Sequence, residues 1–191
     1  MKNKLIFFLK IIFIYIVFTS FSFADLQKNL INKITSTKSL SFNFEQKISE
    51  KIEFGKCYIK YPLLMKCIYQ DSKQKSVISN GKTVAIIKKK YKKIYYYPIK
   101  TTPLFTILKK DKILNLIRNS KPTKIDANLI EFELNQKKNK LKLIFDKNSF
   151  ELKGWKTIDS YSNNVSFIIN DLKINEIIEH DFFRIPQESD L

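Results

Sequence analysis

The sequence has very little glycine and histidine, and this scarcity excludes several kinds of catalytic site. Its three glycines, Gly55, Gly81 and Gly154, stand too far apart to form a glycine-rich loop that binds phosphate. His180 is the only histidine, so a Ser-His-Asp triad would have to use it, and no nucleophile elbow accompanies it. The sequence therefore predicts a protein that is not an enzyme and that needs no cofactor or metal.

Arginine is also scarce, although the chain is strongly basic. The formal net charge is +17, and lysine supplies nearly all of the excess because Arg118 and Arg184 are the only arginines. A cytosolic protein with this charge would suggest nucleic acid binding, but the N-terminus predicts export, so we expect none. Isoleucine and asparagine are frequent too, so we interpret the charge as the composition of a genome biased towards A and T, with attraction to anionic lipid surfaces as the alternative.

The first 24 residues have the layout of a secretory signal peptide. Two lysines precede an apolar run from Leu5 to Phe18, and the small residues Ser22 and Ala24 form a cleavage site before Asp25. An uncleaved membrane anchor is the alternative, although a lysine interrupts the run. We therefore expect cleavage after residue 24 and a mature protein in the periplasm.

Hydrophobic periodicity in residues 25–191 predicts a helix followed by many short strands. Leucines and isoleucines at helical spacing indicate an amphipathic helix from Asp25 to about Thr37. Farther along, apolar residues alternate with polar ones, and tight turns such as Asn80-Gly81 join consecutive strands. No linker or repeat divides this part, so it is expected to form a single domain.

A second helix is expected in the middle of the strands, within TTPLFTILKKDKILNLI, residues 101–117. Thr102 can cap this helix, and Pro103 suits its first position. Its apolar side would lie over the open side of the sheet. Short strands joined by tight turns, with two helices and a last strand near Phe182, predict an α+β fold in which helices close a curled antiparallel barrel or half-barrel.

The stretch CYIKYPLLMKCIY, residues 57–69, is predicted to be a hairpin with one apolar face. Folding it at Pro62 places Cys57 nearly opposite Cys67. In an oxidising compartment such a pair can form a disulfide, and two small buried hydrophobic side chains are the alternative. A sheet of this size encloses more space than side chains need, so the face is a candidate cavity wall, with packed core as the alternative.

Several segments, in order along the chain, carry a family resemblance. The segment GKCYIKYP resembles a G-x-x-x-x-K-R-P motif, and VISNGKTVAIIKKKYKKIYYYPIKTTPLFTIL resembles the strand, turn, hairpin and helix that follow it. The segments LKLIFDKNSFELKGWKTIDSYSNNVSFIINDLKIN and HDFFRIP resemble the C-terminal half. Together these segments resemble the periplasmic outer-membrane lipoprotein carrier proteins, the LolA family, over nearly all of residues 25–191.

The resemblance implies an exported monomer with an unclosed, strongly curled antiparallel β-barrel of about eleven strands, covered by an N-terminal helix and a central lid helix. It also implies an apolar cavity for lipoprotein acyl chains, with Phe42, Phe44, Ile59, Tyr61, Met65, Tyr69, Leu104, Phe105 and Leu108 as candidate contacts. Such carriers receive lipoproteins from an ABC-type extraction complex in the inner membrane. They deliver them to the outer membrane, usually to a receptor lipoprotein, with transient contact to membrane surfaces.

Two other readings stay open at this point. One is a periplasmic module of the same fold that binds glycolipid or free lipid, or that senses mislocalised lipoproteins. The other is a purely structural envelope protein whose interior is filled by its own side chains. The lysine run from Lys88 to Lys93 is predicted to be a solvated turn, and an anionic membrane or an acidic partner is the alternative.

The chain departs from the family motif at one residue. The arginine of K-R-P, which is thought to hold the lid closed in the family, is replaced by Tyr61. A phenol can donate one hydrogen bond to the lid, but it lacks the charge and the five donors of arginine. We therefore expect lid opening, but not cargo binding, to be controlled differently here.

Overall fold

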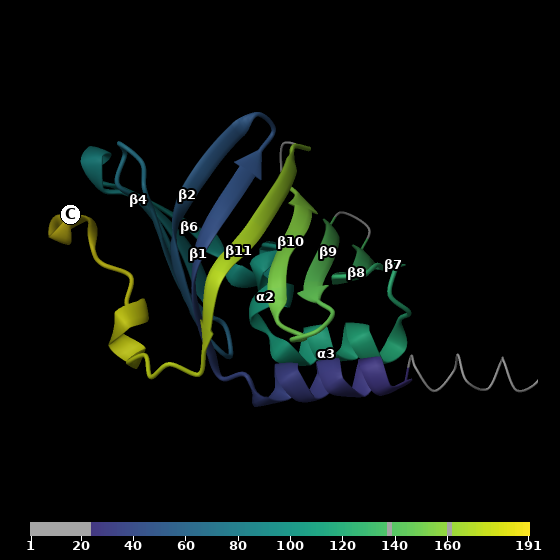
Figure 1. The fold of residues 1–191 in the computed structure, drawn as a ribbon. Helices are drawn as coiled ribbons and strands as arrows, with labels where there is room; N and C mark the ends of the chain where they lie inside the picture. The colour runs from purple at the N-terminus through teal and green to yellow at the C-terminus, as the bar shows by residue number, and fades with distance from the viewer. Residues whose placement is uncertain (1–23, 137–138, 160–161) are drawn as a thin grey trace, which may run out of the picture.

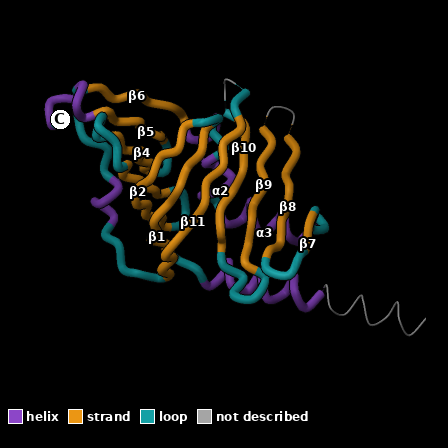
Figure 2. Tube along the Cα trace, turned by 45° about the horizontal axis from the view of Figure 1, so that its top comes forward, coloured by secondary structure: helices purple, strands orange, loops and turns teal. Residues whose placement is uncertain are grey.

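The computed structural model describes residues 24–136, 139–159 and 162–191. One antiparallel sheet of eleven strands, in the order β6-β5-β4-β3-β2-β1-β11-β10-β9-β8-β7, forms its centre and curls strongly (Figure 2). The strands β6 and β7 form the two edges, so the sheet does not close within the described residues. This confirms the predicted unclosed barrel of about eleven strands.

The strands follow one another along the chain, and helices interrupt the series between β6 and β7. Their bounds are β1 Ser39–Ile48, β2 Lys51–Lys60, β3 Leu64–Tyr69, β4 Lys75–Asn80, β5 Thr83–Lys88, β6 Lys93–Pro98, β7 Lys124–Ile125, β8 Leu129–Gln136, β9 Asn139–Asp146, β10 Leu152–Ile158 and β11 Asn164–Ile174. The pairing of β1 with β11 joins the two halves of the sheet.

Alternation along the strands decides which side chains enter the core. In β1 the inward residues Leu40, Phe42 and Phe44 are buried, whereas Asn43 between them is exposed. The turn Asn80-Gly81 joins β4 to β5 as expected: the Asn80 side chain accepts hydrogen bonds from the backbone just beyond the turn, and Gly81 takes the positive φ of +94° that glycine favours.

Helices pack inside the curl of the sheet (Figure 1). Residues 24–36 form an N-terminal helix, and α2 (Leu104–Leu108) and α3 (Lys110–Asn119) form the central helical segment. The N-terminal helix lies beside α3, since the Gln27 side chain donates a hydrogen bond to the Ile117 carbonyl at 2.6 Å. Their apolar residues join the inner face of the sheet in one hydrophobic core.

The prediction of a single central helix is wrong, because this segment forms two helices. The chain is extended at Lys109, with φ −110° and ψ 98°, which separates α2 from α3. Tertiary contacts hold this break. The backbone N–H of Leu63, in the β2–β3 turn, donates to the carbonyl of Leu108 at 2.9 Å, and the Lys110 ammonium donates to the carbonyl of Thr37 at 2.9 Å.

The expected capping of this segment is also wrong. The Thr102 hydroxyl donates to the carbonyl of Ile99 at 2.8 Å, and Thr102 ends a 3-10 turn, η2 (Ile99–Thr101), that precedes α2. Pro103 occupies the capping position instead of the first helical position. The short helix α2 therefore stands between two irregular segments, η2 and Lys109.

The C-terminal segment, residues 175–191, runs along the outer face of the β2–β5 half of the sheet (Figure 1). The strand expected near Phe182 is wrong, because this residue lies in a 3-10 turn, η3 (His180–Phe183). The Phe182 ring packs against Tyr58 with centroids 4.9 Å apart. Beyond it, Ile185 and Leu191 cover a second, small core formed by Ile78, Ala85, Ile87 and Ile94.

The predicted signal peptide, residues 1–24, lies outside the described residues apart from Ala24. That residue begins the N-terminal helix. Within the described ranges, no helix has the length and apolar character needed to cross a membrane.

Candidate functional site: an apolar cavity inside the sheet

The curl of the sheet encloses a cavity of about 690 Å³. Pockets for small ligands commonly measure about 300–1,000 Å³, so the space suits an apolar ligand of moderate size. The inner faces of the strands and the helix α2 supply its lining: Gln46, Ile48, Met65, Cys67, Tyr69, Val77, Thr101, Pro103, Leu104, Ile107, Trp155, Thr157, Ile158, Asp159, Ser162, Val165 and Phe167.

Polar lining residues gather at one end of the cavity. Gln46 and Ile48 lie at the end of β1, Thr157 and Asp159 lie at or just after the end of β10, and Ser162 precedes β11. Register places these elements side by side, since Ile48 is opposite both the first residue of β2 and the second of β11. We call this end the cavity mouth.

Four aromatic rings form a continuous row on the inner wall. Trp155 of β10 stacks on Phe167 of β11 with centroids 4.1 Å apart, and Phe167 stacks on Phe44 of β1 at 4.7 Å. Phe44 in turn meets Tyr69 of β3 edge-on at 4.9 Å. The row crosses the seam between the two halves of the sheet, so it both closes the core and gives the cavity a smooth apolar wall.

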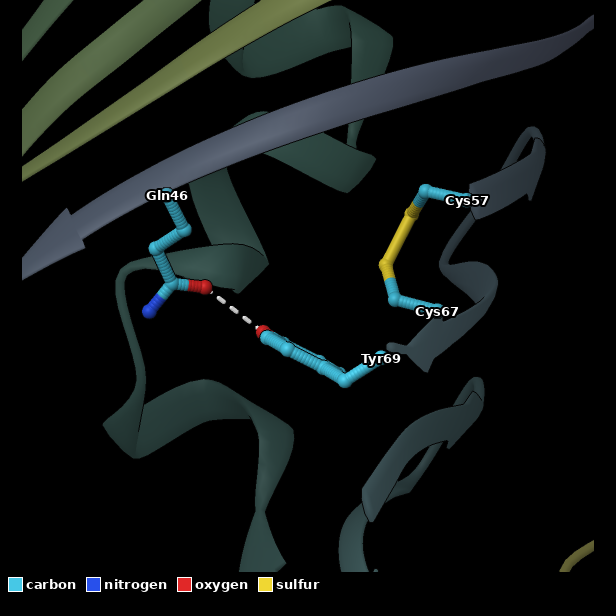
Figure 3. The surroundings of a disulfide bond; sticks show 4 residues. All are labelled: Gln46, Cys57, Cys67 and Tyr69. Atoms are coloured by element: carbon cyan, nitrogen blue, oxygen red, sulfur yellow. Dashed lines mark hydrogen bonds between the residues drawn. A yellow bond between two sulfur atoms is a disulfide. The ribbon is translucent and has the colours of Figure 1, made fainter. Parts of the chain in front are cut away.

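A disulfide lies beside this row (Figure 3). Cys57 of β2 and Cys67 of β3 are directly opposite in register and their sulfurs are bonded. Tyr69, two residues farther along β3, points in the same direction, and its hydroxyl donates to Gln46 Oε1 of β1 at 2.6 Å. The hairpin wall predicted from the sequence is therefore cross-linked, and a hydrogen bond ties it to β1 at the cavity mouth.

Removing the disulfide is expected to destabilise this wall. Replacing both Cys57 and Cys67 by serine should lower the free energy of unfolding by about 2–3 kcal/mol, because the bond closes a loop with a sequence separation of 10 residues. Urea unfolding of the double variant, compared with the oxidised and the dithiothreitol-reduced protein, measures the effect. Equal midpoints for all three samples would contradict a bond in the purified protein.

A buried charge cluster stands behind Tyr69. Glu53 points inward from β2, is 6% exposed, and accepts hydrogen bonds from Lys51 at 2.5 Å and Lys75 at 2.6 Å. The Lys75 ammonium also lies 3.7 Å from the centroid of the Tyr69 ring. Burial alone would raise the pKa of Glu53, but the two lysine hydrogen bonds and charges outweigh it and lower that pKa. The carboxylate therefore stays charged and fixes Lys75 against the ring.

The structure brings three of the nine candidate contacts to the cavity: Met65, Tyr69 and Leu104. Phe42, Phe44, Ile59 and Leu108 are fully buried in the core, at most 2% exposed, and Phe105 is partly buried against it. Their contact with a ligand remains a prediction for a more open form. Alternation along a strand identified the inward face correctly, but it does not distinguish packed positions from cavity-lining ones.

Tyr61 lies away from this cavity. It lines a second, much smaller space of about 30 Å³ under the N-terminal helix. The Lys110 ammonium is 5.7 Å from the centroid of its ring, and burial raises the pKa of Tyr61 well above its ordinary value. The hydrogen bond that joins the hairpin turn to the lid is a backbone bond, from the Leu63 N–H to the carbonyl of Leu108.

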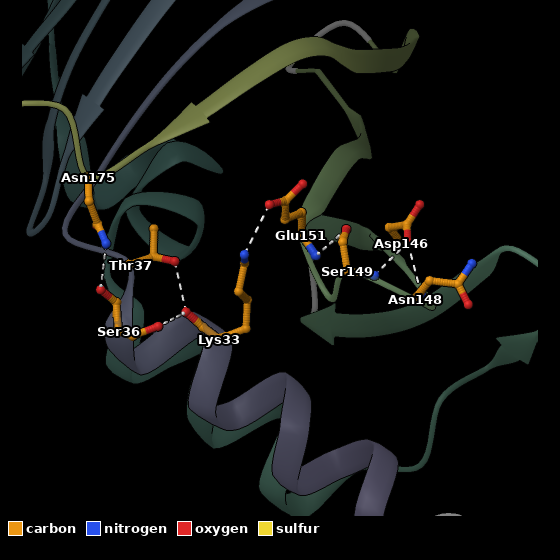
Figure 4. Close-up of polar contacts among 8 residues, drawn as sticks. All are labelled: Lys33, Ser36, Thr37, Asp146, Asn148, Ser149, Glu151 and Asn175. Carbon is orange, nitrogen blue, oxygen red and sulfur yellow. Dashed lines mark hydrogen bonds and ion pairs between the residues drawn. The ribbon is translucent and has the colours of Figure 1, made fainter.

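Polar contacts around the small space hold the N-terminal helix in place (Figure 4). Lys33 forms an ion pair with Glu151 of the β9–β10 turn at 3.0 Å. At the end of the helix, the Thr37 hydroxyl donates to the Lys33 carbonyl at 2.8 Å, and Asn175 donates to the carbonyl of Ser36 at 3.2 Å. The contacts of Glu151 and Asn175 join the helix to the half of the sheet that β7–β11 form.

Sequence reasoning missed several lining residues on the other half of the sheet, on β4 and on α2. Trp155, Val165 and Phe167 lie on β10 and β11, and Val77 and Ile107 lie on β4 and α2. The signal was present, because Val165 and Phe167 alternate with polar or exposed neighbours. The alternation alone could not show that these residues line the same cavity as the hairpin, because this depends on the pairing of β1 with β11.

A family model described as outer membrane lipoprotein carrier protein LolA matches residues 35–186. No curated protein matches the chain.

Solved structures with a similar fold have low sequence identity. They include a LolA superfamily protein from Nitrosomonas europaea, with 8% identity, TM-score 0.41, and coverage of 82% of this chain and 97% of that one. A chain of the Pseudomonas aeruginosa MucA/MucB complex has 8% identity, TM-score 0.46, and coverage of 87% and 62%, so this protein spans less than two thirds of its length. The Mycobacterium tuberculosis lipoprotein LppX has 11% identity, TM-score 0.45, and coverage of 84% and 98%.

Proposed function

The chain belongs to the outer membrane lipoprotein carrier protein family LolA, and we propose that it carries lipoproteins across the periplasm with their acyl chains enclosed in the cavity. The observation that carries the proposal is the space of about 690 Å³ with an aromatic and aliphatic wall. A purely structural protein would fill this space with its own side chains, because protein interiors are normally close-packed.

The physical need for such a carrier comes from the acyl chains. Each methylene exposed to water costs about 0.8 kcal/mol, so a long chain does not leave a bilayer at a useful rate unless something shields it. The inner wall of this sheet offers apolar surface for shielding. No nucleotide or metal is needed at the carrier, because extraction supplies the energy and delivery runs downhill.

The volume of the cavity sets its capacity. A methylene is similar in size to a water molecule, which occupies about 30 Å³ in the liquid, so the space of about 690 Å³ holds roughly 20 methylenes. This corresponds to about one acyl chain. A lipoprotein with three chains therefore requires the cavity to enlarge, and we propose that α2 moves outward as a lid.

Two features favour α2 as the moving part. It is only one helical turn long, from Leu104 to Leu108, and irregular segments flank it on both sides. A single backbone hydrogen bond, from Leu63 N–H to the Leu108 carbonyl at 2.9 Å, joins its end to the hairpin turn. Outward movement of α2 would break that bond and uncover Ile107, which lines the cavity, and Leu108, which is buried beneath it.

The cellular setting follows from the same proposal. Residues 1–24 act as a cleaved signal peptide, and residues 25–191 form a single lipoprotein-carrier domain in the periplasm. The Cys57–Cys67 disulfide supports an oxidising compartment. We propose that the protein works as a monomer, receives cargo from an ABC-type extraction complex in the inner membrane, and delivers it to the outer membrane, usually through a receptor.

A second candidate function is binding of a single-chain lipid or a glycolipid, or sensing of mislocalised lipoproteins, by the same cavity. The observation that favours it is the capacity of about one acyl chain. The two functions differ in what occupies the site in the cell, which a crosslinking experiment can determine.

We would place a photocrosslinking amino acid at Met65 and co-express the exported protein with a tagged, triacylated lipoprotein. Met65 faces the cavity, so we expect an adduct with the lipoprotein that disappears when the acylated cysteine of the cargo is replaced. Lys66, the next residue, points to the outer face and is the matched control position. Adducts with free lipid alone would establish the second function, and no adduct from a folded protein would overturn both.

A further inference from the structure

The hairpin formed by β5 and β6 combines lysines with exposed tyrosines. Its turn reads KKKYKK, residues 88–93, and Tyr91 within it is 51% exposed. Just beyond the turn, β6 carries three tyrosines in a row, of which Tyr96 is 54% exposed. We call residues 88–97 the lysine–tyrosine hairpin.

The positive charge of this hairpin is not neutralised by the chain itself. Among the described residues, no ion pair involves any of the five lysines of the turn. The Glu188 carboxylate approaches the hairpin, but it accepts a hydrogen bond from the Ile94 backbone at 3.3 Å. Lys88 lies over the Tyr95 ring at 5.2 Å. The turn thus presents five cations and an exposed phenol to whatever lies beyond it.

Protection of the sheet edge does not explain this composition. Lysines on an edge strand discourage pairing with another chain, and β6 is an edge strand. The lysines here are concentrated in the turn, however, whereas the middle of β6 consists of Tyr95, Tyr96 and Tyr97. A solvated turn would account for the lysines but not for the exposed tyrosines beside them.

The hairpin lies at the same end of the molecule as the cavity mouth. Lys75, at the start of β4, is opposite Lys88, and Lys88 is opposite Lys93. Ile68, near the end of β3, is opposite Ser76, so successive antiparallel strands bring the β1–β2, β3–β4 and β5–β6 turns to one end. In Figure 2, β5 and β6 form the border of the sheet on the side away from β7.

We propose that the lysine–tyrosine hairpin docks the protein on an anionic bilayer surface. Lysines close to such a surface are attracted by its negative potential. Tyrosine rings prefer the interface, where an apolar body and a polar hydroxyl can both be satisfied. Docking by this hairpin places the cavity mouth toward the lipid headgroups, where an acyl chain could pass in or out; this orientation, unlike the docking, rests on the proposed carrier function.

The test is a sedimentation assay with vesicles and the exported, cargo-free protein, whose N-terminus is first established by intact mass. We expect binding to vesicles of equal parts phosphatidylglycerol and phosphatidylcholine, and none to phosphatidylcholine alone. Replacing Lys89, Lys90 and Lys92 together by glutamine should weaken binding at least tenfold, since each lysine contributes about fivefold. Tyr91→Ser should weaken binding less and without changing its salt dependence.

A matched control removes the same charge elsewhere. Lys28, Lys112 and Lys121 are exposed residues on or beside the helices, and their triple glutamine variant should bind nearly as well as the unchanged protein. Equal losses of vesicle binding in both triple variants would overturn the proposal. It would also be overturned if the unchanged protein did not bind anionic vesicles at low salt, and that result would favour an acidic protein partner. Cargo crosslinking at Met65 is measured separately, so failure of docking and failure of the carrier function are distinguishable.

Discussion

Replacing Val77 by tryptophan is expected to reduce acyl-chain binding at least tenfold while the protein stays folded. Val77 points inward from β4 and lines the cavity opposite Cys67. An indole at this position would project into a space that holds about one acyl chain, and it would occupy much of that space. Because the cavity is open there, the larger side chain need not displace packed neighbours, so the usual cost of overpacking is avoided.

The measurement is a titration of the exported protein with a fluorescent, triacylated lipopeptide, with circular dichroism to confirm the fold. Ser76→Trp is the matched control, because Ser76 is the neighbouring residue on the same strand and faces the outer groove. It introduces the same side chain without entering the cavity, so binding should be unchanged. Normal binding by Val77→Trp would place the acyl chains somewhere other than this cavity and would contradict the proposed function.

The strand part of the fold could be predicted from the sequence because its signals are local. Alternation of Leu40, Phe42 and Phe44 with polar residues reports which face is buried, and the Asn80-Gly81 turn fixes a hairpin register within a few residues. The facing of Cys57 and Cys67 follows in the same way from the turn between β2 and β3. Each of these features depends on residues close together in the chain.

The central helix was predicted incorrectly because neither glycine nor proline marks the break at Lys109. A weaker signal was present, since the charged residues 109–112 separate two apolar stretches that would fall on different faces of one continuous helix. The break is fixed by residues far away in the sequence, namely Leu63, which binds the Leu108 carbonyl, and Thr37, which accepts from Lys110. Propensity yields to tertiary contacts of this kind.

The location of the cavity could not be predicted for a related reason. Phe44 and Tyr69 both point inward, but only Tyr69 borders open space. The difference depends on where Trp155 and Phe167 lie, about a hundred residues later in the chain, and on how closely α2 approaches the sheet. The pattern of one sequence predicts neither the positions of these two rings nor the distance between α2 and the sheet.

Gly55→Ala is expected to cause the largest loss of stability of any single-methyl addition on the hairpin. Gly55 lies in β2 between Phe44 of β1 and Tyr69 of β3. A Cβ at this position would overlap the carbonyl oxygen of Ile68 and would lie 2.7 Å from the Phe44 ring. The carbonyl belongs to the sheet backbone, and Phe44 is held between Phe167 and Tyr69 in the aromatic row, so neither can move without disturbing the wall.

We therefore expect Gly55→Ala to lower the free energy of unfolding by about 3 kcal/mol, at the upper end of the usual cost of overpacking. The total free energy of unfolding of a native domain is about 5–15 kcal/mol, so a loss of this size is readily measured by urea unfolding. Lys56→Ala, the exposed neighbour, should change stability by no more than about 0.5 kcal/mol. An unchanged midpoint for Gly55→Ala would mean that β2 and β3 lie farther apart than described. The glycine is needed because the chain must bring Phe44 flat against β2, which is also what gives the cavity its aromatic wall.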